Sequence, residues 1–206
     1  MMYKRWLLVL PGVALLAVAF NTAMNLVQSE IWRYQTENFL DYWQEETKAD
    51  SGFAVDEKEW QLTLAGVDKA LAEMPGSPDL QVLRAKVLEW GLRSGWSASD
   101  QAEPMELAAW QQSILLRPGW PNSWSNYALA RSQRSLIDDQ FEAALVRADQ
   151  LGPWEQQVME NAMVMGRYYR GWISEPVQNI LDDSQERLMQ LYPHRTRQLE
   201  KQYPLN

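Results

Sequence analysis

The feature that most constrains this chain is a pair of near-identical helix stops that bracket two helix-sized stretches. The stops are Leu116–Pro118 (sequence LRP) and Leu151–Pro153 (LGP), and they lie 35 residues apart. Proline removes a backbone donor and ends a helix, so each stop marks a place where the chain turns. A period of this length predicts a unit of two antiparallel helices that buries its apolar faces by stacking on its neighbours.

The residues between the stops resemble a tetratricopeptide repeat, a helix-turn-helix unit with a period of about 34 residues. If Pro118 closes one unit, the next begins at Pro121, where a missing donor costs little. Small residues let the two helices approach closely, and bulky ones fill the space between units. The matching positions are Trp124, Tyr127 and Ala128 in the first helix and Ala148 and Leu151 in the second.

Related stops on both sides extend the pattern. They give 43 residues from Pro75 to Pro118 and 40 residues from Pro153 to Pro193. We expect an α-solenoid of about three to four helix pairs, with a final capping helix in residues 194–206. The stretch Ser94–Pro104 is expected to be a loop longer than a repeat turn, either an insertion on the binding face or drift in an old repeat. Asp56 and Glu59 predict a capping box at the first repeat helix.

The N-terminal segment predicts a membrane anchor. Trp6–Val27 holds 22 residues without a charge, about the length that crosses a bilayer. Lys4 and Arg5 precede it, which predicts a cytoplasmic N-terminus and an exported remainder, periplasmic in a Gram-negative bacterium. The alternative is a cleaved signal peptide, because Ala17–Ala19 has an A-x-A pattern. Apolar residues continue beyond that point, which favours the uncleaved anchor.

Residues 28–48 are amphipathic at helical spacing and predict a helix that continues out of the membrane. Its apolar stripe is expected to dock on the repeats; the alternative is pairing with a second copy of the chain. Residues 49–55 have the composition of a loop. The predicted organisation is therefore an anchor in 1–27, a juxtamembrane helix and loop in 28–55, and an all-α repeat domain in 56–206. The apolar stripe consists of Ile31, Trp32, Phe39, Tyr42 and Trp43.

The amino-acid composition gives little support for a catalytic or metal-binding site. The chain has no cysteine and one histidine, His194, so a thiolate metal site is excluded and a His-based triad lacks its surroundings. The net charge of −8 argues against nucleic-acid binding. Adjacent acid pairs occur at 45–46, 138–139 and 182–183. The last two are interpreted as helix starts or solvated faces, with Asp138 as a helix N-cap. We expect no catalytic residue, metal or cofactor.

A binding surface remains. Stacked helix pairs form a concave face lined by the first helices, and its candidate residues are Arg84, Asn122, Asn126 and Arg131. Solvated polar positions are the competing interpretation of these four residues. The eleven tryptophans are mostly expected to be wedges between helices. Trp120, which lies in a turn, is the best candidate for an exposed one.

The whole layout combines a charge-flanked anchor, a Trp-rich helical domain and the stretch SILLRPGWPNSWSNYALAR. In these features it is similar to the VpsP-type exopolysaccharide-biosynthesis membrane proteins. It implies an inner-membrane scaffold whose partners are membrane or periplasmic proteins of a polysaccharide assembly machine. One alternative is a glycan-contacting enzyme or subunit that uses exposed tryptophans and a carboxylate pair. The other is a general envelope-assembly adaptor, for secretion or cytochrome maturation.

Overall fold

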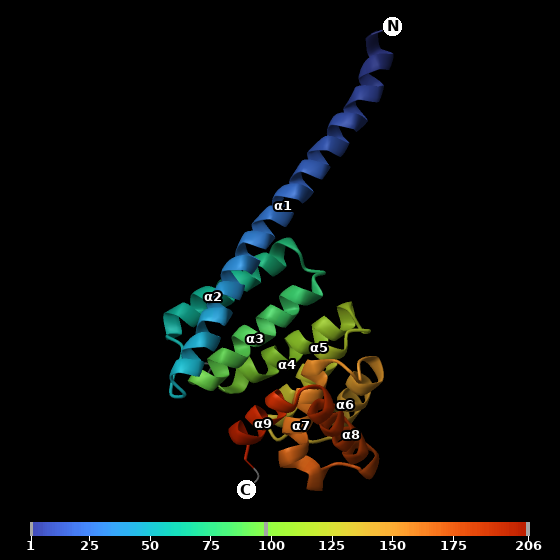
Figure 1. Cartoon of the computed structure of the whole chain (residues 1–206). Coiled ribbons are helices and arrows are strands. Elements are labelled where there is room, and N and C mark those ends of the chain that lie inside the picture. The colour runs from blue at the N-terminus through green and yellow to red at the C-terminus, as the bar shows by residue number, and fades with distance from the viewer. Residues whose placement is uncertain (1, 97–98, 205–206) are drawn as a thin grey trace. The chain divides into compact units, whose positions relative to one another are not determined.

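The computed structural model describes residues 2–96 and 99–204, with the side chains of residues 11–96 and 104–204. Within these ranges the regular structure is helical (Figure 1). The chain forms two compact units, unit 1 (Met1–Ala98) and unit 2 (Ser99–Asn206). The fold is all-α, as predicted, with a long apolar N-terminal helix followed by helices that pack in pairs as in tetratricopeptide repeats. Unit 1 holds α1 (Met2–Ala49), α2 (Glu57–Glu73) and α3 (Pro78–Ser94); unit 2 holds α4 (Ser99–Leu116), α5 (Pro121–Ser132), α6 (Asp139–Leu151), α7 (Gln156–Tyr169), the short 3₁₀ helix η1 (Arg170–Trp172), α8 (Glu175–Leu191) and α9 (Pro193–Gln202).

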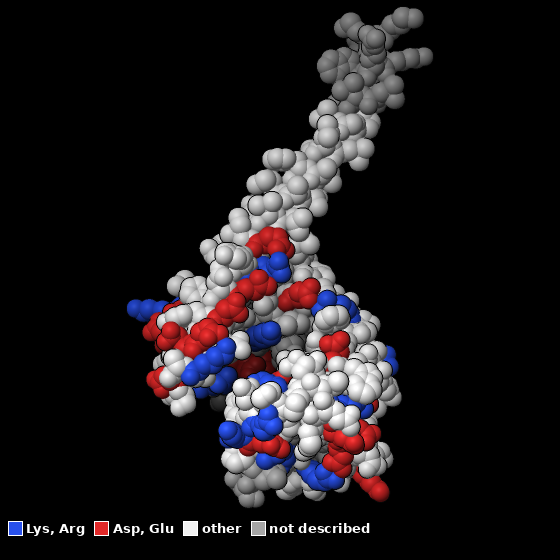
Figure 2. All heavy atoms as spheres, in the orientation of Figure 1, with Lys and Arg blue, Asp and Glu red and all other residues white. Residues whose placement is uncertain are grey.

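Helix α1 joins the predicted span and the predicted juxtamembrane helix without a break. Every described side chain from Pro11 to Met24 is exposed, and Figure 2 shows no charged atoms on this part of α1. Of the described helices, this one is long and apolar enough to cross a membrane, with a mean hydropathy of 1.3. The side chains of Lys4 and Arg5, on which the predicted orientation depends, lie outside the described set.

The C-terminal half of α1 packs on α2 and α3, as the docking interpretation of its stripe predicted. Trp43 is fully buried, and its ring lies 5.8 Å from that of Trp90, edge to face. The indole N–H of Trp60 donates to the Val87 carbonyl at 2.8 Å. Gly91 leaves room for this indole, because a Cβ atom there would lie 2.4 Å from the Trp60 ring. The three helices of unit 1 are therefore held together by the packing of tryptophan and aliphatic side chains.

The ends of the unit 1 helices follow local capping rules. Asp56 accepts hydrogen bonds from the backbone N–H groups of Lys58 and Glu59 and so caps α2. The predicted capping box is half correct, since the Glu59 carboxylate accepts from the Trp43 indole in the structure. Gly95 ends α3 with a φ of 78°, a left-handed conformation that favours glycine.

The long loop predicted over residues 94–104 is wrong for the described part of that stretch. Helix α3 runs to Ser94 and α4 begins at Ser99, with Pro104 inside α4. The extra residues between the helix stops therefore lengthen helices, which have 17 and 18 residues here against 12 and 13 in α5 and α6. The composition of this stretch predicted a loop wrongly because Ser, Asp and Gly favour both loops and helix starts. Residues 97–98 lie outside the described set.

Helices α5 and α6 form the pair that the two stops predicted. Tyr127, Ala128 and Ala148 are buried between them, and Trp124 is half-buried with its N–H donating to the Pro118 carbonyl. Gly152 in the second stop packs against the start of α5, because a Cβ atom there would lie 2.7 Å from the Pro121 ring. Small residues set the close approach, as the repeat pattern requires.

The second pair of unit 2 consists of α7 and α8, and α9 follows as the predicted final helix. Helix α7 also packs beside α5, so the first helices of the two pairs are neighbours. The phenolic O–H of Tyr169 donates to the Ser132 carbonyl at 2.6 Å and links the ends of these two helices. This arrangement places the polar side chains of α5 and α7 on one continuous surface.

Candidate functional site

A ladder of four amide side chains crosses the surface where α5 and α7 meet. Asn161 is buried, and its amide N–H₂ group donates to Ser125 Oγ at 3.0 Å and to Asn126 Oδ1 at 2.9 Å. Gln157 donates to Asn161 Oδ1 at 2.9 Å. We call Asn122, Asn126, Gln157 and Asn161 the amide ladder.

The ladder repeats with the period of the helix pairs. Gln157 follows Asn122 by 35 residues, and Asn161 follows Asn126 by 35. The two amides on each helix, Asn122 and Asn126 on α5 and Gln157 and Asn161 on α7, are four residues apart and so lie on one face of their helix. The hydrogen bonds run from Gln157 through Asn161 to Asn126, whose own N–H₂ group has no acceptor among the described residues. Amides that both donate and accept are suited to the alternating C=O and N–H groups of an extended peptide.

Two of the four predicted groove residues belong to this ladder. Asn122 and Asn126 are half-buried on α5, and Asn126 accepts a hydrogen bond from Asn161 on α7. The Oδ1 atom of Asn122 is buried with no hydrogen-bond partner among the described residues. Buried polar atoms are usually satisfied, so an unsatisfied amide oxygen at this surface marks a candidate ligand contact.

Arg131 has a different position from the one that the sequence analysis expected. Only 7% of it is exposed, and its guanidinium donates to the Tyr127 hydroxyl at 2.9 Å and to Gln140 Oε1 at 3.0 Å. It also pairs with the Asp138 carboxylate. These contacts join α5 to the start of α6, so the structure gives Arg131 a packing role, and its predicted binding role stays a prediction.

Asp138 is the helix N-cap that the sequence predicted. It accepts from the backbone N–H groups of Gln140 at 3.1 Å and Phe141 at 3.0 Å. Burial raises the pKa of this carboxyl, but hydrogen bonds from Phe141 and Arg131 outweigh that effect and hold the pKa below its ordinary value.

Arg84, the fourth predicted residue, belongs to unit 1. Its guanidinium donates to Asp68 at 2.7 Å, which links α3 to α2. The members of the ladder all lie in unit 2.

A cavity of about 470 Å³ adjoins the ladder in unit 2. Gln157 lines it together with Glu160 and Arg195, which form a two-bond ion pair at 2.9 and 2.8 Å. Burial raises the pKa of Glu160, whereas hydrogen bonds from Arg195 and Gln156 lower it, and the net shift is downward. The pair fixes α9 to α7 and gives one wall of the cavity a fixed charge pattern.

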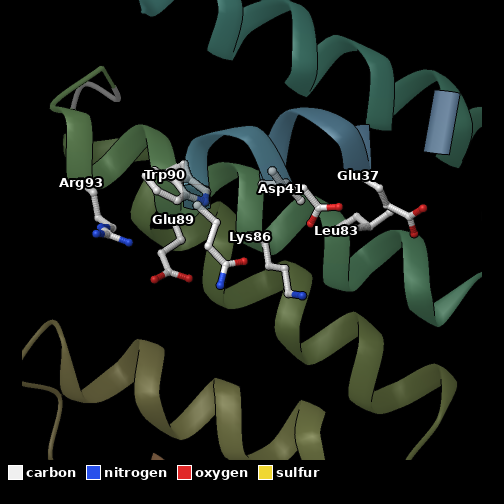
Figure 3. A pocket seen from close by; sticks show the side chains of 9 residues that line it. Glu37, Asp41, Leu83, Lys86, Glu89, Trp90 and Arg93 are labelled. Carbon is white, nitrogen blue, oxygen red and sulfur yellow. The ribbon is translucent and has the colours of Figure 1, made fainter. Parts of the chain in front are cut away.

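Unit 1 has a groove of its own between α1 and α3, of about 540 Å³ (Figure 3). Acidic residues from α1, Glu37 and Asp41, line one wall. Figure 3 shows the charged ends of Lys86, Glu89 and Arg93 on α3 pointing to the same side. The floor includes Trp90, over which the Arg93 guanidinium lies at 4.6 Å. Mixed charge with an aromatic floor is suited to a polar peptide more than to an apolar ligand.

Trp120 is exposed, with 43% of its surface accessible, and the Arg117 guanidinium lies 4.4 Å from its ring. Two other tryptophans of unit 2 are more exposed, Trp154 at 62% and Trp172 at 78%. Arg187 lies 5.6 Å from the Trp154 ring. The tryptophans that the sequence interpreted as wedges include Trp43, Trp60 and Trp110, which are buried.

One member of each acid pair makes a structural contact. Asp138 caps α6, Asp182 accepts two hydrogen bonds from Arg170, and Glu45 pairs with Lys48 at 2.6 Å. Among the described residues no group of three or more His, Cys, Asp or Glu side chains could hold a metal ion. His194 Nδ1 lies 3.0 Å from an Arg197 nitrogen on the same helix.

Comparisons with known proteins find no family model and no curated sequence that matches the chain. Among solved structures it is similar to the crystal structure of MamA protein, with a TM-score of 0.45 and 10% identity over 90% of this chain and 97% of that one. It is also similar to YrrB, described as a TPR protein with an unusual peptide-binding site, with a TM-score of 0.37 and 15% identity over 78% and 97% of the two chains. Scores this low do not bear on function. The helix pairs themselves support the repeat assignment.

Sequence reasoning missed Gln157 and Asn161. The signal was present, because the same 35-residue period that relates the helix stops also relates the two amide pairs. It is less evident because Met159 and Ala162 of α7 stand where Trp124 and Tyr127 stand in α5. Comparing polar positions at the repeat period would have predicted the ladder.

Proposed function

We propose that this chain is a membrane-anchored, TPR-like scaffold that binds an extended segment of a partner protein along its first helices. The observation that carries the proposal is the amide ladder, in which Gln157, Asn161 and Asn126 of two neighbouring helices join into one hydrogen-bonded row. Asn122 lies one helical turn before Asn126 and leaves its amide oxygen without a partner among the described residues. Such a row offers donors and acceptors to a peptide backbone at fixed spacing. The charged groove of unit 1 supports the same type of ligand.

The anchor is α1, and the proposed location is the inner membrane with the repeats in the periplasm. The support is the exposed apolar surface of α1 from Pro11 onward, together with Lys4 and Arg5 before it. A cleaved signal peptide would remove this segment. Detection of full-length protein in washed membranes, by mass spectrometry of its N-terminal peptide, would support the anchor and exclude cleavage.

The finer proposal is a role in exopolysaccharide assembly and export, which the layout of the chain suggests by its likeness to VpsP-type proteins. Affinity-tagged full-length protein crosslinked in native membranes tests it. Capture of a polysaccharide polymerase, chain-length regulator or export component would support this role. Capture of secretion or cytochrome-maturation proteins would favour a general envelope-assembly adaptor.

A second candidate is direct contact with glycans, which the three exposed tryptophans of unit 2 favour, because indole rings stack on sugars. The test is tryptophan fluorescence of the full-length protein in detergent, titrated with oligosaccharide. A change that disappears in Trp120→Ala, Trp154→Ala or Trp172→Ala would support glycan contact. No change, together with a captured protein partner, would leave the scaffold as the better account.

A further inference from the structure

Helix α1 has two apolar faces, and only one of them is covered. Thr36, Leu40 and Trp43 are buried against α2 and α3. On the opposite side of the same turns, Ile31 and Tyr34 are 52% and 66% exposed. At 3.6 residues per turn, residues 31 and 34 lie about half a turn away from residues 36 and 40.

This second face begins in the predicted span and continues beyond it. Its positions alternate by four and three residues, the spacing that keeps one face of a helix toward a partner helix. All of its members are exposed in the structure. We name it the outer stripe; it consists of Phe20, Met24, Val27, Ile31 and Tyr34.

Lipid explains only part of the outer stripe. Ser29 Oγ donates to the Ala70 carbonyl at 3.2 Å, and Gly66 lies against Trp32 and Thr36. Helix α2 therefore covers α1 from Ser29 onward, so that Ile31 and Tyr34 stand level with the folded part of unit 1. Large apolar side chains at this level need a protein contact more than a lipid one.

We propose that the outer stripe is a self-association face, through which two copies of this chain pair as parallel helices. The inference rests on the proposed anchor, because insertion in one direction makes the two helices parallel. The stripe ends where pairing would become unfavourable: the next positions in the spacing are Asn38 and Asp41, and two like charges at a helix seam repel.

The residues beside the outer stripe fit a second copy of the same helix. On one side lie Glu30 and Glu37, which are both paired with Arg33, at 2.8 and 3.2 Å. On the other side lie Gln28 and Gln35. In a parallel pair each side of one helix meets the opposite side of its partner, so Glu30 comes beside Gln35 of the second copy. An amide that donates to a carboxylate avoids the repulsion that two acidic sides would give.

The chain has no cysteine, so single cysteines give an unambiguous test. Ile31→Cys and Tyr34→Cys would be placed separately in the full-length protein and oxidised in membranes. We expect each to form a disulfide-linked species of twice the mass. The matched control is Gln44→Cys, exposed on another face of α1, which should stay monomeric. Adding Tyr34→Asp to the Ile31→Cys variant should abolish its crosslink.

Three results would contradict the proposal, and each has a different meaning. Absence of the doubled species at both positions, in protein that resists alkaline carbonate extraction, would overturn the proposal and leave lipid as the cover. A crosslink at these positions to a protein of different mass would overturn it in favour of a partner's membrane helix. Release of the protein by carbonate would refute the proposed anchor itself, a failure that the extraction detects before any crosslink is measured.

Discussion

Unit 1 and unit 2 are both built of packed helices, but they bury chemically different side chains. Among the described side chains of unit 1, the buried polar ones are Ser29, Thr36 and Thr63, whose hydroxyls donate to backbone carbonyls of α1 and α2. Unit 2 buries ionisable and amide side chains as well, namely Glu106, Arg131, Glu160 and Asn161.

The difference teaches how each unit obtains a defined arrangement. Apolar packing is strong but not directional, and in unit 1 large indoles and close glycines make it specific. Buried ion pairs and amides stabilise less on balance, yet they tolerate little displacement and so fix which helix residues face each other. Unit 2 carries the amide ladder, where that precision of position is needed.

The largest expected effect is in the core of unit 1. Trp43→Ala removes a fully buried indole and should destabilise unit 1 by about 4 kcal/mol. Hydrogen exchange of full-length protein in detergent would show lost protection in α1–α3. Trp172→Ala is the matched control, because that indole is 78% exposed and its loss should cost less than about 0.5 kcal/mol. Equal effects of the two variants would contradict the packing described for unit 1.

The next effect concerns a buried ion pair of unit 2. The Glu106 carboxylate is fully buried and pairs with Arg134. Arg134→Met leaves that charge without this partner and should cost about 3 kcal/mol. The double variant Glu106→Met with Arg134→Met removes both charges and should recover most of the loss. Urea unfolding of the single and double variants measures this, and a double variant less stable than Arg134→Met would refute a buried-charge penalty.

A smaller effect tests the close approach in unit 1. Gly91→Ala places a methyl group within 2.4 Å of the Trp60 ring and should destabilise the unit by about 2 kcal/mol. Gly76→Ala is the control, since nothing lies within 4 Å of a Cβ atom there. Thermal unfolding compares the two, and similar melting temperatures would mean that the Trp60 indole does not occupy this position.

The smallest expected effect is a pH dependence of the stability of unit 2. The pKa of Glu160 is lowered in the folded protein, so its pairing with Arg195 stabilises unit 2 above the ordinary carboxyl pKa. That contribution is lost as pH falls through the folded pKa. Glu160→Gln should therefore cost about 1 kcal/mol at pH 7 and progressively less as pH falls toward 3. Hydrogen exchange at both pH values reports it in α7 and α9; a loss that persists undiminished at pH 3 would show that charge is not the cause.

Much of the fold could be predicted, because its signals are local. Prolines, the Asp56 and Asp138 caps and the small residues Ala128 and Ala148 act within one or two helix turns. The 35-residue period then gives the helix pairing. The expected loop at 94–104 failed because residue composition alone does not separate a loop from the first turn of a helix.

The candidate site was only half predictable. Asn122 and Asn126 were found from their place on a first helix, whereas Arg131 was expected at the surface and is buried. Its burial depends on Tyr127, Asp138 and Gln140 converging from two helices, which spacing along one helix does not reveal. Long-range convergence of this kind decides which polar residues are available to a ligand.

The central claim is that a partner protein lies along the amide ladder, and a photocrosslinking amino acid tests it most directly. It would replace Gln157, an exposed ladder residue on α7, and in a separate variant Gln150, an exposed residue on the second helix α6. Both would be irradiated in native membranes. We predict a discrete protein adduct at position 157, mapped by mass spectrometry to one segment of the partner, and none at position 150. The same adduct at both positions, or at position 150 alone, would contradict the account.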